Sequence, residues 1–262
     1  MSVTGPMCCA PNWGDGMTLD LYSFTHPGGR PYNEDRCAAV QGPAPQGLPL
    51  LLLADGLGGH GHGDQAAEFI VQALHRFWKT RAPDPANAAA ALAEEIVAAN
   101  EKLIEAQQKL HRTMRTTIVA VAPGPDTLAC VHCGDSRLYL IQAGGIRQLT
   151  QDHSVTYKKY LAGQIGFRQI NRDEDRSGLL RAVGDADRCQ PEAQTLPVRL
   201  APGDGLLLCS DGFWEYMQPE EILADCLKSD TAAEWGSWML RRVMERLTPD
   251  TDNLTLMAGL CT

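Results

Sequence analysis

The sequence predicts an α+β fold: a four-layer α-β-β-α sandwich, with two antiparallel sheets flanked by antiparallel helix pairs. The observations behind this prediction are a series of strand-length apolar runs and two separate pairs of helical stretches. The chain has 262 residues and is 44% hydrophobic, so one domain can bury a sizeable core. Each sheet and helix has an apolar face to cover, and two stacked sheets beneath helices on both outer faces cover all of them.

The predicted strands are short apolar runs, most of them bounded by glycine, proline or aspartate. They cover residues 48–54, 118–122, 128–133, 138–142, 206–209 and 254–258.

The first predicted helix pair covers residues 63–81 and 88–110. Apolar residues recur at helical spacing along one stripe of each stretch. The Pro-Asp-Pro break at residues 83–85 separates the two helices and predicts an antiparallel arrangement.

The second predicted pair covers residues 219–228 and 231–247. Its first helix begins with proline and two glutamates, as helix starts prefer. Residues 154–188 are charged and only weakly periodic, which predicts a short helix followed by a surface flap. No linker or long repeat divides the sequence, so residues 1–262 are expected to form a single catalytic domain that acts as a monomer.

Composition excludes several classes of protein. Wholly apolar runs such as residues 50–54 are far shorter than the roughly 20 residues of a membrane span, and residues 1–11 do not resemble a secretory signal. We therefore expect a cytoplasmic protein without a membrane partner. A net charge of −9 argues against nucleic acid as a partner.

The cysteines do not indicate a disulfide framework. Nine cysteines make an odd number, and several lie in apolar segments where a thiol acts as a small hydrophobic group. Cys130 and Cys133 have C-x-x-C spacing, but no second pair accompanies them, so they are predicted to be strand residues rather than a redox or zinc site.

Two predicted strands end in the same way, one at Asp55-Gly56 and the other at Asp211-Gly212. Asp-Gly after a strand is often a hairpin turn, but the residues that follow do not resemble a return strand at either position. Two further acidic elements, residues 30–35 and Asp252-Asn253, lie in loops. Together these elements predict carboxylates that converge on one cleft.

In combination, these elements resemble the metal-dependent protein phosphatases of the PPM, or type 2C, family, particularly its bacterial members. The matching pieces extend from about residue 20 nearly to the end: residues 30–35, Asp55-Gly56-Leu57-Gly58-Gly59-His60, Gly134-Asp135-Ser136-Arg137, Leu149-Thr150-Gln151-Asp152-His153-Ser154, Ser210-Asp211-Gly212 and Asp252-Asn253.

The resemblance implies two Mn²⁺ or Mg²⁺ ions bridged by Asp55. The backbone carbonyl of Gly56 and the carboxylate of Glu34 would complete one metal site, and the carboxylates of Asp211 and Asp252 would complete the other. Mg²⁺ and Mn²⁺ favour such oxygen ligands, and a water that bridges two ions becomes a good nucleophile at phosphorus.

Three further residues receive roles from the same resemblance. Asp35 would orient metal-bound water, and Arg30 would bind phosphate oxygens through its planar guanidinium group. Asp135 would hold a third, looser ion together with Asp211. The implied activity is hydrolysis of phosphoserine and phosphothreonine in proteins, reversing the action of a bacterial serine/threonine kinase.

Two positions depart from the family pattern. Leu57 stands where animal relatives have a histidine thought to protonate the leaving group. His60 and His62 lie nearby in the sequence, but the glycines between them predict a tight turn. We therefore prefer metal-bound water to these histidines as the acid. A zinc role for these two histidines is disfavoured. Arg115 precedes Thr116 where bacterial relatives usually have glycine; it either faces solvent or alters the approach to the cleft.

Two rival functions are weaker. A pseudophosphatase that binds phosphorylated proteins without hydrolysis would be expected to have lost metal ligands, and none is lost here. A two-metal nuclease conflicts with the acidic net charge. The cysteine-dependent phosphatase loop is absent from the sequence, and Asp185-Ala186-Asp187 is predicted to be a surface loop rather than a nucleophile motif.

Overall fold

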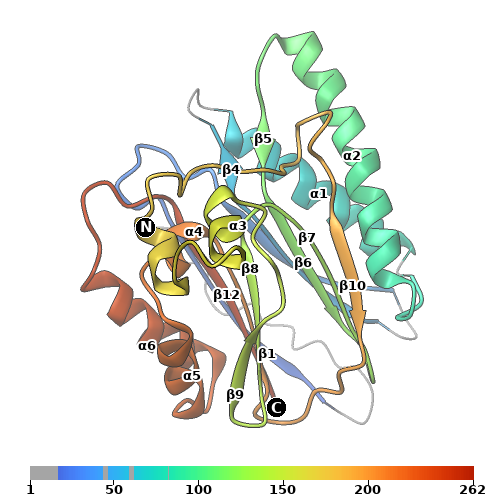
Figure 1. Ribbon diagram of the computed structural model, residues 1–262. Coiled ribbons are helices and arrows are strands. Elements are labelled where there is room, and N and C mark those ends of the chain that lie inside the picture. The colour runs from blue at the N-terminus through green and yellow to red at the C-terminus, as the bar shows by residue number, and fades with distance from the viewer. Residues whose placement is uncertain (1–16, 44–46, 59–61, 82) are drawn as a thin grey trace.

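The computed structural model describes residues 17–43, 47–58, 62–81 and 83–262 (Figure 1). Two five-stranded sheets form its centre, and all pairings within them are antiparallel. The first sheet has the order β1 (Leu19–His26), β12 (Leu254–Cys261), β11 (Gly205–Cys209), β8 (Arg137–Gln142) and β9 (Gly145–Gln148). The second has the order β10 (Glu192–Leu196), β7 (Leu128–Cys133), β6 (Ile118–Pro123), β3 (Pro49–Ala54) and β2 (Arg36–Gln41).

Helix pairs cover the outer faces of both sheets, which confirms the predicted four layers. Helices α1 (Gly63–Arg81) and α2 (Ala88–Leu110) pack on the second sheet, and α5 (Pro219–Leu227) and α6 (Ala232–Met244) pack on the first (Figure 1). Within the described residues, no helix is long and apolar enough to cross a membrane.

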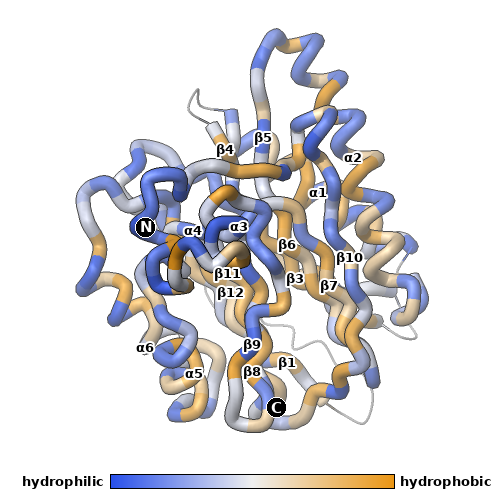
Figure 2. Tube along the Cα trace, in the orientation of Figure 1, coloured by the Kyte–Doolittle hydropathy of each residue, from blue (hydrophilic) through white to orange (hydrophobic). Residues whose placement is uncertain are grey.

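Alternation along the strands explains why the central runs are apolar throughout. On β11, Leu206 and Leu208 join the core between the sheets, whereas Leu207 and Cys209 join the core beneath α5 and α6. Successive strand side chains point to opposite faces, so a strand covered on both sides carries no polar face. In Figure 2 the hydrophobic colours accordingly follow the central strands.

Four strands of the two sheets were not predicted by the apolar runs: β1, β2, β9 and β10. Each has partly exposed positions, and all four lie at the edges of the two sheets. Their sequences therefore mix polar and apolar residues and lack the continuous apolar run that marks a doubly covered strand.

The segment predicted as a flap is largely irregular. It begins with the short helix α3 (Val155–Leu161), whose N-cap Ser154 accepts a hydrogen bond from the amide of Tyr157, and continues through a 3₁₀ helix (Phe167–Arg172). Residues 173–191 contain no helix or named strand and pass over the strand ends before β10 begins (Figure 1).

Helix α6 supplies a matched pair of tryptophans for testing this packing. Trp235 is fully buried against α5, whereas Trp238 remains 38% exposed. We expect Trp235→Ala to lower the free energy of unfolding by about 3–5 kcal/mol, because it leaves a large cavity. Trp238→Ala is expected to cost less than about 1 kcal/mol. Urea unfolding of both variants checks this, and equal losses would contradict the described packing.

Candidate active site

Asp55 directly follows β3, and hydrogen bonds with Thr116 and Thr117, just before β6, hold its backbone in place. Its amide donates to Oγ1 of Thr117 at 3.0 Å, and its carbonyl accepts from the amide of Thr117 and from Oγ1 of Thr116, both at 2.8 Å. The two-residue strands β4 (Gly56–Leu57) and β5 (Arg115–Thr116) pair directly beyond it. The side chain of Asp55 therefore projects from a fixed backbone at the end of a buried strand.

Glycine is required next to Asp55. A Cβ atom at Gly56 would lie 2.5 Å from the backbone carbonyl of Gly63, the first residue of α1, and 2.7 Å from the carbonyl oxygen of Glu34. This close approach brings three segments of the chain together. Asp55-Gly56 is therefore a packing junction and does not form a hairpin turn.

Asp211 begins the four-residue helix α4 (Asp211–Trp214), directly after β11 and Ser210. A Cβ atom at Gly212 would lie 2.2 Å from the carbonyl oxygen of Asn253. The loops that carry Asp211 and Asp252 therefore touch.

Asn253 attaches the segment of Glu34 to this junction. Its Oδ1 accepts from the amide of Glu34 at 2.7 Å, and its Nδ2 donates to the carbonyls of Pro27 and Tyr32, both at 2.9 Å. Residues more than 200 positions apart are thereby held in one place. Asn253, the second residue of the Asp-Asn motif, therefore has a structural role.

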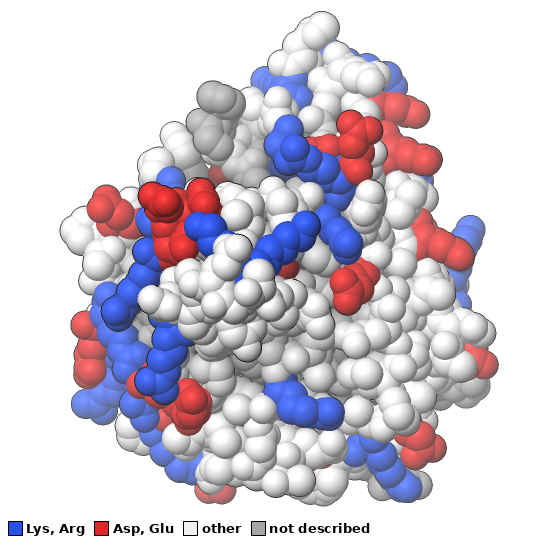
Figure 3. All heavy atoms as spheres, viewed as in Figure 1, with Lys and Arg blue, Asp and Glu red and all other residues white. Residues whose placement is uncertain are grey.

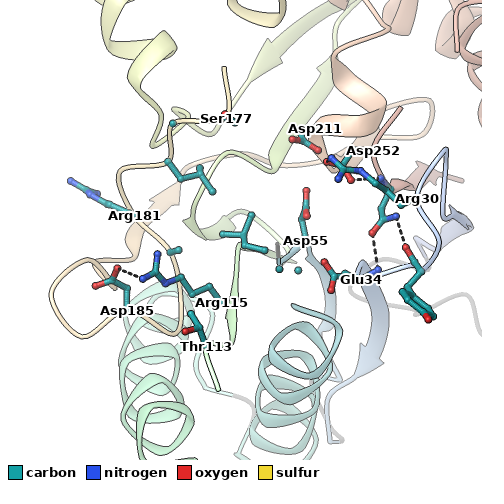
Figure 4. A pocket seen from close by; sticks show the side chains of 18 of the residues that line it. Arg30, Glu34, Asp55, Thr113, Arg115, Ser177, Arg181, Asp185, Asp211 and Asp252 are labelled. Carbon is teal, nitrogen blue, oxygen red and sulfur yellow. Dashed lines mark hydrogen bonds and ion pairs between the residues drawn. The ribbon is translucent and has the colours of Figure 1, made fainter. Parts of the chain in front are cut away.

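The predicted ligands Glu34, Asp55, Gly56, Asp211 and Asp252 all line one pocket of about 850 Å³ (Figure 4). Arg30 lines the same pocket, where its guanidinium group forms an ion pair with Asp252 at 2.8 Å. The predicted phosphate-binding arginine is therefore held at the acidic cluster by a predicted metal ligand.

Asp35 and Asp135 lie behind the wall of this pocket instead of lining it. Asp35 is 1% exposed and accepts a hydrogen bond from Ser210 at 2.9 Å, and Asp135 is 6% exposed. The indole nitrogen of Trp214 donates to the carbonyl of Asp135 at 3.0 Å. Both aspartates are therefore buried, and burial followed by the charge of Asp211 raises the pKa of Asp135.

The clustered carboxyl groups resist ionisation. Burial, followed by repulsion from Asp35 and Asp211, raises the pKa of Asp55 well above its ordinary value. Burial is also the main cause that raises the pKa of Asp35 to about 7 and that of Asp211 to about 6. The buried atoms Oδ1 of Asp35 and Oδ1 of Asp211 have no hydrogen-bond partner among the described residues. A cation would satisfy the free oxygen of Asp211 and offset the repulsion within the cluster.

The motif residues Arg137 and Asp152, which received no role from the sequence, form a buried ion pair. The guanidinium group of Arg137 reaches both carboxylate oxygens of Asp152 at 2.6–3.1 Å and stacks 3.6 Å from the ring of Trp214. Trp214 also donates to the carbonyl of Asp135, so the ion pair packs against the side chain that holds the backbone of Asp135. The two residues are 15 positions apart in the sequence, so their contact could not be predicted from local spacing.

Three further residues, His132, His153 and Glu192, place potential ligand atoms within 4.8 Å of one another beneath the flap. A guanidinium nitrogen of Arg181 lies 3.0 Å from Nε2 of His153 and 3.8 Å from the carboxylate of Glu192. A metal ion bound there would be repelled by the charge of Arg181. We therefore assign these three residues the role of holding the Arg181 side chain in place. His60 lies outside the described residues.

The comparisons with known proteins agree with this geometry. Residues 26–255 match the family model described as protein phosphatase 2C. The chain is 34% identical over 205 residues to "Serine/threonine phosphatase stp" of Listeria welshimeri, covering 76% of this chain and 79% of that protein. It is 33% identical over 186 residues to "Protein phosphatase PhpP" of Streptococcus pneumoniae, covering 70% and 74% respectively.

Solved structures show the same fold. Serine/threonine phosphatase Stp1 from Staphylococcus aureus superposes with a TM-score of 0.83 at 26% identity, covering 92% of this chain and 94% of that one. The Mycobacterium tuberculosis phosphatase PstP/Ppp superposes with a TM-score of 0.79 at 27% identity, covering 92% and 98%. The chain belongs to the protein phosphatase 2C family, as the sequence motifs indicate.

The buried ion pair predicts a large cost when one partner is removed. Asp152→Ala should lower the free energy of unfolding by about 3–5 kcal/mol, because Arg137 is left charged and buried. As a control, Asp175→Ala removes a half-exposed partner of Lys159 and is expected to cost less than about 1 kcal/mol. Chemical denaturation measures both, and a stable Asp152→Ala protein would contradict the assigned role.

The raised pKa values predict that the metal-free protein is destabilised by its own site. Folding favours the protonated form of a carboxyl group whose pKa is raised, so stability falls as the pH rises from about 4, the unfolded pKa, to about 6 for Asp211. In excess chelator at pH 8, Asp211→Asn should therefore melt a few degrees above the unchanged protein, and the difference should shrink at pH 5.

Thermal melting in chelator at both pH values measures this difference. Asp230→Asn, an exposed position between α5 and α6, serves as the control and should leave the melting temperature unchanged. A lower melting temperature for Asp211→Asn at pH 8 would contradict the proposed repulsion.

Proposed function

We propose that the chain is a metal-dependent serine/threonine protein phosphatase whose site holds two Mn²⁺ or Mg²⁺ ions. Glu34, Asp55, the carbonyl of Gly56, Asp211 and Asp252 would be the ligands. The observation that carries the proposal is the convergence of these groups, from four distant stretches of chain, on one pocket. The pKa values of Glu34, Asp55 and Asp211 are all raised in the absence of ions.

The donor set fits hard divalent cations. All side-chain donors are carboxylates, which Mg²⁺ and Mn²⁺ prefer over nitrogen or sulfur. When bound, two such ions lower the pKa of a shared water and neutralise charge that develops on the phosphoryl oxygens. Burial, followed by the charge of Asp211, raises the pKa of Asp135, which supports a third, looser ion held by these two aspartates.

The chain's own residues would orient the phosphate and the attacking water. Arg30 is 55% exposed at the pocket wall, and its guanidinium group can exchange Asp252 for phosphate oxygens once a cation occupies that carboxylate. Asp35 keeps one buried oxygen unpaired while Ser210 holds the other, which suits it to orient a water molecule. A proton at the leaving oxygen is supplied from water in the open pocket.

Phosphorylated proteins are the substrates that the relatives indicate. The similar proteins from Listeria welshimeri and Staphylococcus aureus are named serine/threonine phosphatases, and the chain covers more than two thirds of each. We further propose that the protein reverses the action of a cognate bacterial serine/threonine kinase. It would act as a monomer in the cytoplasm, with a single catalytic domain over residues 1–262. The pseudophosphatase alternative is not favoured, because all five proposed ligands of the two-metal site line the cleft.

The direct test is hydrolysis of p-nitrophenyl phosphate and of a phosphothreonine peptide. We expect Mn²⁺-dependent turnover of both substrates, which excess chelator abolishes. Asp211→Asn should reduce kcat roughly hundredfold or more, because one carboxylate ligand is lost, while Asp230→Asn keeps full activity. Activity that survives chelation, or normal Mn²⁺ binding without turnover of either substrate, would contradict the proposed function.

A further inference from the structure

The wall of the pocket opposite the acidic cluster is basic. Figure 4 shows Arg115, Arg181 and Asp185 on one side of Asp55, and Arg30, Glu34 and Asp252 on the other. Arg188 also lines the pocket. Three arginines, Arg115, Arg181 and Arg188, line the pocket together with Asp185, and of the three only Arg115 has a charge contact with Asp185 among the described residues. We call these three residues the arginine wall.

We propose that the arginine wall selects phosphoprotein substrates that carry a second anionic side chain close to the phosphoserine or phosphothreonine. The second anion is a carboxylate or another phosphate, both of which a guanidinium group binds through paired hydrogen bonds. This inference rests on the proposed phosphatase function, because the first phosphate is taken to lie at the acidic cluster.

Arg115 occupies a fixed position near the reacting centre. It pairs with Leu57 across β4 and β5, two residues beyond Asp55, and the next residue, Thr116, donates its hydroxyl to the carbonyl of Asp55. Two extended residues span about 7 Å. A substrate side chain one to three residues from the phosphorylated one can therefore reach Arg115 while the phosphate lies at Asp55.

The guanidinium group of Arg115 is available to a ligand. Its side chain is 46% exposed, and its contact with Asp185 is long, at 3.9 Å. The carboxylate of Asp185 also accepts from the backbone amides of Asp187 and Arg188, at 3.2 and 3.3 Å. Asp185 thus orders its own loop and leaves most of the hydrogen-bonding capacity of Arg115 for a ligand.

Arg181 is positioned by the cluster beneath the flap. Its guanidinium nitrogen lies 3.0 Å from Nε2 of His153 and donates to the carbonyl of Gln190 at 3.3 Å. Arg188 is exposed at the rim, and within the described residues its side chain has no ion-pair partner. Figure 3 shows that charged side chains gather over the upper and left parts of this face, whereas its lower middle carries few.

The position of Arg115 also agrees with its departure from the family pattern. The family resemblance implies glycine before the two threonines, whereas here the position carries a long cation that lines the pocket. The sequence left open whether this arginine faces solvent or alters the approach to the cleft. The structure places it at the approach, with half of its side chain exposed to the pocket and the surrounding solvent.

The test compares short phosphoserine peptides that differ only beside the phosphoserine. One set carries alanine at all flanking positions, a second carries a single aspartate at each position up to three residues away on either side, and a third replaces that aspartate by a second phosphoserine. We expect kcat/KM for the best aspartate or phosphoserine peptide to exceed that of the alanine peptide about three- to tenfold, mainly through KM. The preference should fall as salt is raised.

Arg115→Ala should remove most of this preference while leaving kcat/KM for p-nitrophenyl phosphate unchanged, because that small substrate has no second anion. Arg115→Glu should reverse it. Arg112→Ala, an exposed arginine nearby that does not line the pocket, is the matched control and should keep the preference. A preference for aspartate and phosphoserine alike identifies charge as the recognised feature, and a preference for the second phosphoserine alone identifies phosphate.

Equal kcat/KM for all peptides with the unchanged protein would overturn the inference. An equal loss for alanine and aspartate peptides in Arg115→Ala would do the same. Neither result touches the proposed function, which is tested separately by Mn²⁺-dependent hydrolysis of p-nitrophenyl phosphate and its loss in excess chelator. The two failures are therefore distinguishable in one set of assays.

Discussion

Mutual repulsion among buried carboxylates is the constraint on which the rest of this structure depends. Asp35, Asp55, Asp135 and Asp211 all have raised pKa values, with burial as the main cause and neighbouring carboxylates as a further one. Such a cluster does not assemble through attraction between its members. The backbones that carry the side chains have to hold them together, at a cost in stability that bound cations would offset.

The layered fold meets this requirement through contacts between backbones. The ends of β3 and β11 deliver Asp55 and Asp211, and glycines at positions 56 and 212 let the adjoining loops approach more closely than any side chain would allow. Asn253 ties a third segment to the same point through three hydrogen bonds. The rigid sandwich thus positions the acidic side of the pocket, whereas a flap without named strands supplies two arginines of the opposite side.

The sequence predicted the parts of the fold that depend on continuous apolar runs or helical periodicity. Strand β3 is an example, since all six of its residues are buried and four of them are leucine. Strands β9 and β10 were missed because half-exposed edge strands mix polar and apolar residues. Of the six metal-site residues that the motifs predicted, Glu34, Asp55, Gly56, Asp211 and Asp252 line one pocket, whereas Asp135 does not. The motifs did not predict the Arg30 to Asp252 pair or the burial of Asp35 and Asp135 behind the pocket wall, because these depend on tertiary contacts between distant segments.

The central claim is that carboxylates from four stretches of the chain hold two cations at Asp55. The most direct measurement is anomalous scattering at the manganese edge from crystals grown with Mn²⁺. The account predicts two peaks about 3.5–4 Å apart, bridged by Asp55 and contacted by Glu34, Asp211 and Asp252. Peaks located only at His132, His153 and Glu192, or an acidic cluster that stays empty at saturating Mn²⁺, would contradict it.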